Sequence, residues 1–172
     1  MSGKPNIKLR PTRLDDLDLL KLWDEQPHVI ASGVDGDEWQ WETELQHNPE
    51  WRDQFIAELN GRPIGYVVII NAAREESHYW GDVSEDIAAI DIWIGEPDFL
   101  GKGYGTQIMQ QAIAKCFANP EINTILIDPL SSNVRAHRFY EKLGFEFVEE
   151  RNFDGDDCFI YRLERNSHHV RI

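Results

Sequence analysis

One short segment carries most of what this sequence reveals about its fold and its site: Leu100-Gly101-Lys102-Gly103-Tyr104-Gly105-Thr106. Residues 87–94 before it are apolar except for Asp91, which predicts a strand. Residues 104–117 after it repeat apolar side chains at helical spacing. Glycines let a backbone approach a ligand closely, and a helix start presents free N–H groups to an anion. The segment therefore predicts an anion-binding turn between a strand and a helix.

Glycine spacing alone does not decide which anion is bound. A nucleotide-binding P-loop requires a glycine, four residues and then Gly-Lys-Ser/Thr, and this pattern is absent. A dinucleotide fingerprint requires Gly-x-Gly-x-x-Gly near the start of its domain, whereas this turn has another spacing and lies after residue 100. A purely structural turn is the remaining alternative, so a second segment is needed.

That second segment follows the pattern Asn-x-x-Ala-x-x-x-Tyr-x-x-x-Gly-Phe, at Asn133, Ala136, Tyr140, Gly144 and Phe145. The first segment fits Gln/Arg-x-x-Gly-x-Gly/Ala, with leucine at the position of Gln or Arg. Together the two segments resemble the GNAT superfamily of N-acetyltransferases. Leucine at that position removes one side-chain contact but leaves the backbone cradle.

Within the superfamily, the chain is most similar to bacterial aminoglycoside 6'-N-acetyltransferases. The similarity lies in Ala89-Ile90-Asp91, Ile127-Asp128-Pro129 and Ser132–Ala136, with Asn119–Glu121 and Gly61–Tyr66 in support. A related branch acetylates hydroxylysine-type amines in siderophore synthesis. The resemblance implies an α/β (α+β) GNAT fold: one mixed, mostly antiparallel central sheet flanked by helices. We expect a single domain over residues 1–172, with a frayed tail from about 166 to 172.

The remaining elements follow from local patterns. Strands are expected at 54–59 and 64–70, joined by a tight hairpin at Asn60-Gly61, and at 124–127. Thr12 is expected to cap a helix over 13–25, and residues 26–49 to form a loop with a short helix near 38–46. A helix over 132–143 is expected to be capped by Ser131 or Ser132, and a last hairpin to join 145–151 with 158–163.

The resemblance implies acetyl-CoA as co-substrate, with no metal. Its pyrophosphate would lie on the turn from Leu100 to Thr106, and its pantetheine arm along the backbone of Ile92, Trp93 and Ile94. Asn133 and Ala136 would also contact the cofactor; the alternative for Asn133 is a plain helix-capping role. Tyr140 would lie near the thioester sulfur, where a phenol can donate a hydrogen bond to the departing thiolate.

Two aspartates are the candidates for proton transfer from the substrate amine. Asp91 is expected to be the general base, because it lies on the strand that leads to the turn, where the enzymes that this chain resembles keep such an aspartate. Asp128, at the end of the next expected strand, resembles a second substrate-contacting aspartate of these enzymes, which implies a role as base or as anchor for the amine. The alternatives are a purely structural carboxylate at Asp91 and a helix-capping or turn role at Asp128 before Pro129.

The charge distribution points to a cationic substrate. The net charge is −14, and the stretches from Lys21 to Arg52 and from Arg74 to Lys102 contain acidic residues and all six tryptophans but no Lys or Arg between their ends. Carboxylates attract a cation and aromatic faces hold it, so Asp37, Trp39, Tyr79 and Trp80 are expected to contact a polycationic amine, together with Asp91 and Asp128. The alternative is an acidic, solubilising surface over core tryptophans.

Other partners are disfavoured. A phosphate backbone requires a basic footprint, so nucleic acid is not expected, and no apolar run approaches the length that a membrane span requires. With two isolated cysteines and no signal-type start, the chain is expected to be cytoplasmic, as a monomer or homodimer.

The leading hypothesis is acetyl transfer to the 6'-amine of aminoglycosides, conferring resistance. The alternatives are acetylation of a siderophore precursor, a polyamine or a protein N-terminus, and a non-catalytic CoA-binding domain.

Overall fold

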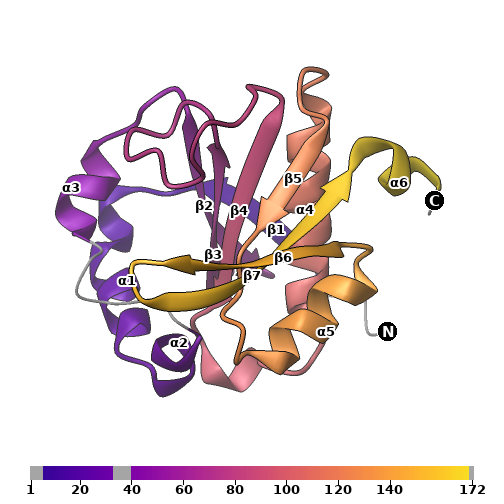
Figure 1. The fold of residues 1–172 in the computed structure, drawn as a ribbon. Coiled ribbons are helices and arrows are strands. Elements are labelled where there is room, and N and C mark those ends of the chain that lie inside the picture. The colour runs from indigo at the N-terminus through magenta and orange to yellow at the C-terminus, as the bar shows by residue number, and fades with distance from the viewer. Residues whose placement is uncertain (1–5, 33–39, 171–172) are drawn as a thin grey trace. The chain divides into compact units, whose positions relative to one another are not determined.

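The computed structural model describes residues 6–32 and 40–170, with the backbone alone at 168–170. Its strands are hydrogen-bonded in the order β1-β2-β3-β4-β5-β7-β6. β1 pairs antiparallel with β2, β4 pairs parallel with β5, and β7 pairs antiparallel with both β5 and β6. This is the mixed sheet with accompanying helices that the sequence predicts (Figure 1).

The chain divides into two compact units: Met1–Val68 with Ile92–Gln111, and Ile69–Asp91 with Ala112–Ile172. The division falls inside β3 (Arg62–Asn71), β4 (Ile87–Ile94) and α4 (Tyr104–Ala118), so each of these elements contributes to both units.

The first unit begins with β1 (Ile7–Pro11) and β2 (Arg52–Leu59), which pair with Ile7 opposite Leu59. The short elements η1 (Leu14–Asp16), α1 (Leu17–Asp24), α2 (Pro27–Ala31) and α3 (Trp41–Gln46) lie between them in sequence, and η2 (Pro97–Phe99) follows β4. Helix α1 contacts both α2 and α3, and the three lie together in Figure 1. Helix α2 was not predicted, whereas α3 lies within the expected short helix.

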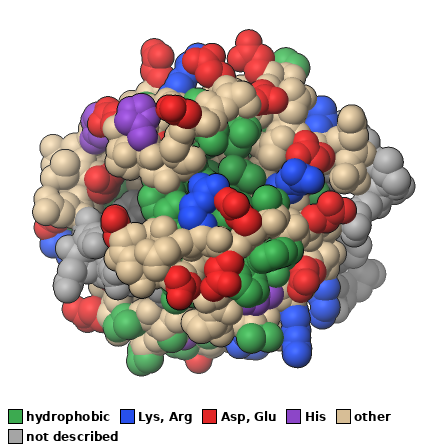
Figure 2. All heavy atoms as spheres, in the orientation of Figure 1, with side chains coloured by type: hydrophobic (Ala, Val, Ile, Leu, Met, Phe, Trp, Pro, Cys, Tyr) green, Lys and Arg blue, Asp and Glu red, His purple; other side chains and the backbone are tan. Residues whose placement is uncertain are grey.

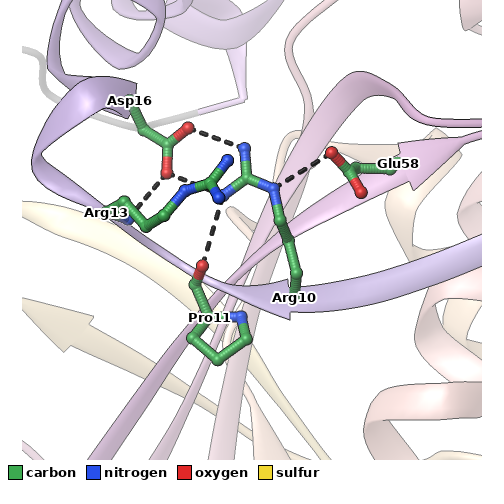
Figure 3. A network of polar contacts seen from close by, with 5 residues as sticks. All are labelled: Arg10, Pro11, Arg13, Asp16 and Glu58. Atoms are coloured by element: carbon green, nitrogen blue, oxygen red, sulfur yellow. Dashed lines mark hydrogen bonds and ion pairs between the residues drawn. The ribbon is translucent and has the colours of Figure 1, made fainter.

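An ionic network ties β1, η1 and β2 together (Figure 3). Asp16 accepts hydrogen bonds from Arg10 Nη2 at 2.7 Å and from the Arg13 N–H at 2.7 Å, and Arg10 Nε donates to Glu58 at 3.0 Å. The prediction that Thr12 caps a helix was wrong. The Thr12 N–H donates to the Gln54 carbonyl at 3.1 Å, which extends the β1–β2 pairing, and a 3-10 turn precedes α1.

The second unit contains the start of β4, the end of α4, β5 (Thr124–Ile127), α5 (Val134–Lys142), β6 (Glu146–Phe153), β7 (Asp156–Glu164) and α6 (Arg165–Val170). Strands β6 and β7 form the long hairpin seen in Figure 1. Strand β7 lies between β5 and β6, so the last strand in sequence is an inner strand of the sheet. Helix α6 occupies residues for which the sequence suggested a frayed tail.

Helix α5 is capped by Asn133, whose Oδ1 accepts the Ala136 N–H at 3.2 Å. The predicted caps Ser131 and Ser132 were therefore wrong by one or two residues. The Ser131 N–H is engaged elsewhere, since it donates to the Asp157 carbonyl at 2.8 Å. The predicted stop at Gly144 is confirmed, because this glycine has a φ of 103° directly after the helix.

Part of the core of the second unit consists of Ala72, Trp80, Ala89 and Ile160. Their burial places the loop between β3 and β4 against strands β4 and β7. Over the described ranges, no helix combines the length and apolarity that crossing a bilayer requires.

Candidate active site

The glycine turn lies in the first unit and has the backbone that its sequence requires. Gly101 and Gly103 have φ values of 71° and 83°, a region that side chains disfavour. Helix α4 begins directly afterwards at Tyr104, and the Gln107 N–H donates to the Gly103 carbonyl at 3.4 Å. A Cβ at Gly103 would meet nothing within 4 Å. The backbone of the turn is thus accessible at the start of a helix, where an anion is favoured.

The segment that leads to this turn is held by α1 and α2. The Trp23 indole N–H donates to Glu96 at 3.1 Å, and a Cβ on Gly95 would lie 2.0 Å from the Trp23 ring. The His28 Nε2 lies 2.7 Å from the Ile94 carbonyl oxygen, so this carbonyl already has a polar partner. Of the residues expected beside pantetheine, Trp93 is buried, while Ile92 and Ile94 are half-buried.

Two cations accompany the turn. Lys102, which the sequence singled out, is exposed, with its Nζ 5.8 Å from the centre of the Phe99 ring. The Arg62 guanidinium lies 4.9 Å from the same ring and 3.8 Å from Glu96. Sequence reasoning missed Arg62, because nothing local indicates that β3 begins beside η2.

The two candidate aspartates meet in the second unit. Strands β4 and β5 run parallel, with Ala89 opposite Leu126. Asp91 lies two residues after Ala89 on β4, and Asp128 directly follows β5. The two carboxyl groups are close enough for the charge of Asp91 to act on Asp128. The loop after β5 is also pinned to β7, where the Phe159 N–H donates to the Pro129 carbonyl at 2.9 Å. The sheet therefore presents two carboxyl groups side by side.

The two carboxyl groups do not ionise like exposed aspartates. Both residues keep some accessible surface, but their carboxyl groups lie among protein atoms. Burial raises the pKa of Asp91 to about 6. Burial and the neighbouring Asp91 charge raise the pKa of Asp128 to about 7. Hydrogen bonds from the Tyr79 hydroxyl and from the Asp128 backbone act in the opposite direction but are outweighed. Because two neighbouring like charges disfavour double ionisation, the pair can hold a proton near neutral pH. Such a pair can accept a proton from an ammonium group.

Tyr79 joins this pair. Its hydroxyl donates a hydrogen bond to Asp128 Oδ2, and its ring stacks on Phe153 with centroids 4.3 Å apart. Trp80 was also expected to contact substrate, but its side chain is only 6% exposed and packs edge-on against Tyr79 at 5.4 Å. The sequence did not predict that Phe153 and Cys158 would lie at this site. The Cys158 thiol is buried, and its burial together with the charge of Asp128 raises its pKa to about 11.

Tyr140 on α5 faces the same carboxyl groups. Its side chain is buried, and burial together with Asp91 and Asp128 raises the pKa of its phenol. The hydroxyl therefore stays protonated and can act as a donor. Ala136 and Asn133 lie about one and two turns before Tyr140, respectively, and the Asn133 amide oxygen is engaged as the helix cap.

Asp37 and Trp39, two expected substrate contacts, lie outside the described residues. Acidic side chains are spread over the face of the molecule drawn in Figure 2, in keeping with the net charge of −14. Across the described part of the chain, no group of three or more His, Cys, Asp or Glu is arranged to hold a metal ion.

The fold, the glycine turn and the Asn-to-Phe motif are those of an acetyltransferase, and the model of the acetyltransferase (GNAT) domain family matches residues 12–153. This chain belongs to that family. The resemblance drawn from its two motifs is confirmed.

Individual relatives narrow the comparison. The chain is 32% identical over 153 residues to aminoglycoside N(6')-acetyltransferase type 1 of Klebsiella pneumoniae, covering 84% of this chain and 76% of that protein. It is 27% identical over 177 residues to lysine N-acyltransferase MbtK of Mycobacterium tuberculosis (strain ATCC 25618 / H37Rv), covering 95% and 80%. The solved structure of aminoglycoside acetyltransferase AAC(6')-Ib with coenzyme A and kanamycin is similar with a TM-score of 0.84 at 28% identity, covering 96% of this chain and 98% of that one.

Proposed function

We propose that this protein transfers the acetyl group of acetyl-CoA to the 6'-amine of aminoglycosides and thereby confers resistance. The observation that carries the proposal is the carboxyl pair Asp91 and Asp128, with Tyr140 beside it. A polycationic substrate needs an acidic site with a group that can accept its proton. The relative of Klebsiella pneumoniae supports the choice of substrate.

We assign acetyl-CoA to the glycine turn and the strand before it. The accessible backbone from Leu100 to Thr106, with Lys102 beside it, suits a pyrophosphate. Strand β4 continues to Ile94, five residues beyond the last recorded pair with β5, Ala89 and Leu126. Backbone groups on such a continuation can hydrogen-bond the amides of pantetheine.

The reaction follows from these assignments. One carboxylate of the pair takes a proton from the substrate ammonium, and the free amine attacks the thioester carbonyl carbon. A C–N bond forms, the C–S bond breaks, and Tyr140 donates a proton to the departing thiolate. Asp91 is our candidate base, and Asp128 either shares that role or anchors the amine. The new amide nitrogen loses its second proton as the C–S bond breaks, a proton returns to the Tyr140 phenolate, and the carboxyl group of the pair releases its proton to solvent.

A second candidate function is acylation of a lysine-type or hydroxylysine-type amine. The 27% identity to a lysine N-acyltransferase, over 95% of this chain, favours it. A carboxyl pair serves any ammonium substrate, so the site chemistry is shared. The third possibility, a CoA-binding domain without catalysis, would leave the Asp91–Asp128 pair and Tyr140 without a use.

The test is release of CoA thiol from acetyl-CoA over a panel of amines. Kanamycin and tobramycin should give turnover, whereas a 2-deoxystreptamine drug with a hydroxyl at the 6' position should give much less. Turnover of hydroxylysine alone would select the second function. Acetyl-CoA binding without turnover of any amine would select the third. Expression in a susceptible strain should raise the inhibitory concentration of the same drugs.

We also propose a cytoplasmic location, where acetyl-CoA is available to the enzyme. The two free cysteines are both buried, which suits a reducing compartment.

A further inference from the structure

Tyr79 is partly exposed, yet both its ring and its hydroxyl are engaged in contacts with other side chains. Its ring is stacked on Phe153 with an interplanar angle of 9° and meets Trp80 edge-on, while 42% of the residue remains exposed. Its hydroxyl donates to Asp128 Oδ2. The ring and the hydroxyl are therefore both fixed, and the hydroxyl is directed at a carboxyl group of the site.

The backbone of Tyr79 is fixed as well. The Glu75 carboxylate accepts the Tyr79 N–H at 3.0 Å, the Ser77 N–H at 2.8 Å and the Ser77 hydroxyl at 2.7 Å. Asn71, at the end of β3, accepts the Arg74 N–H at 3.1 Å. The loop between β3 and β4 thus has its own hydrogen-bonded framework, which delivers Tyr79 to Asp128.

We propose that Tyr79 is a positioning residue for acetyl transfer, whose hydroxyl holds the Asp128 carboxylate beside Asp91 in the orientation used for proton transfer. This inference rests on the proposed function, because it assigns a role within the same carboxyl pair.

The charges around Asp128 explain why such a donor is needed. The groups that face it are Asp91 from β4, Tyr140 from α5 and Cys158 from β7. Burial and Asp91 both raise the pKa of Asp128, whereas the Tyr79 hydroxyl and the backbone amide of Asp128 lower it. The pKa of the Tyr79 phenol is itself raised, by burial and by Asp128, so the phenol remains a donor. Without the Tyr79 hydroxyl, burial and the charge of Asp91 should therefore raise the pKa of Asp128 further.

The test is Tyr79→Phe, which keeps the stacked ring and deletes the donor. Carbon-13 NMR titration of the aspartate carboxyl groups in the free protein should show the higher apparent pKa of the pair rising by about one unit. The acidic limb of kcat/KM should shift by the same amount, giving about a tenfold loss one unit below the midpoint and recovery above it. The matched control is Tyr161→Phe, a buried tyrosine of β7, which should leave the titration in place.

A second variant tests the framework while keeping the tyrosine. Glu75→Ala removes the acceptor of the Tyr79 N–H and should shift the titration upward by a smaller amount. An unchanged titration in both variants would overturn the proposal, and so would a loss of kcat/KM that is equal at every pH. The carboxyl titration needs no substrate, so an absence of turnover with all aminoglycosides would reject the proposed substrate without touching this result.

Discussion

Replacing Asp91 by asparagine should stabilise the protein while it impairs catalysis. Burial raises the pKa of Asp91 from 3.8 to about 6, so folding disfavours the ionised carboxylate at neutral pH. A difference of about 2 pKa units corresponds to about 3 kcal/mol as an upper limit. Partial exposure and screening reduce this figure, and we expect a gain of about 1–2 kcal/mol for Asp91→Asn at pH 8.

The sign of the effect fixes its pH dependence. In the unfolded chain the carboxyl group loses its proton near pH 4, whereas in the folded protein it does so near pH 6. The wild-type protein should therefore lose stability as the pH rises from about 4 to about 7, and the penalty should be complete above that range. In the variant, the amide does not titrate. The difference in stability should be close to zero at pH 4 and largest at pH 8.

Urea unfolding at pH 4, 6 and 8 measures this directly, and the midpoint of the variant should rise by about 0.5–1 M at pH 8. The control is Asp53→Asn, an exposed carboxylate of β2, which should show no such pH-dependent gain. Equal differences at all three pH values would refute the reasoning, and so would a variant that is less stable than wild type at pH 8.

Four further substitutions test the remaining parts of the site. Tyr140→Phe should lower kcat by about 10- to 100-fold while the Kd for acetyl-CoA changes little, because only the proton donor is lost; steady-state kinetics and calorimetry separate the two. Gly103→Ala should lower the free energy of unfolding by about 1 kcal/mol through backbone strain and should weaken acetyl-CoA binding. Gly95→Ala should lower it by about 3 kcal/mol, because the new Cβ overlaps the Trp23 ring. Urea unfolding measures both changes in stability. Asn133→Ala should cost about 1 kcal/mol through the lost cap, and an unchanged KM for acetyl-CoA would limit the residue to that structural role.

The sequence correctly predicted those elements that are determined by residues close together in the chain. Asn60 and Gly61 adopt φ values of 51° and 86°, as the tight hairpin requires, and the strands at 87–94 and 124–127 have the predicted bounds. The same holds for the turn at Gly101 and Gly103, since backbone freedom is a property of the residue itself. These predictions depended on neighbours within a few positions.

Competition between nearby candidates was decided by tertiary contacts. Ser131, Ser132 and Asn133 are all good caps by type, and the bond from the Ser131 N–H to Asp157 on β7 helps place the helix start after Asn133. Helix α2 was missed because it spans only five residues, too few to show a period.

The amino-acid sequence alone specified the family, the glycine turn and the identities of Asp91, Asp128 and Tyr140, because each depends on residue type within a short motif. The tertiary structure decided that Asp91 on β4 and Asp128 after β5 lie close together and that Tyr79 donates to Asp128. It also decided that Trp80 is a core residue. Strand register and loop placement depend on hydrogen bonds between residues far apart in the chain, and the altered proton affinity of the carboxyl pair arises only from that proximity and burial.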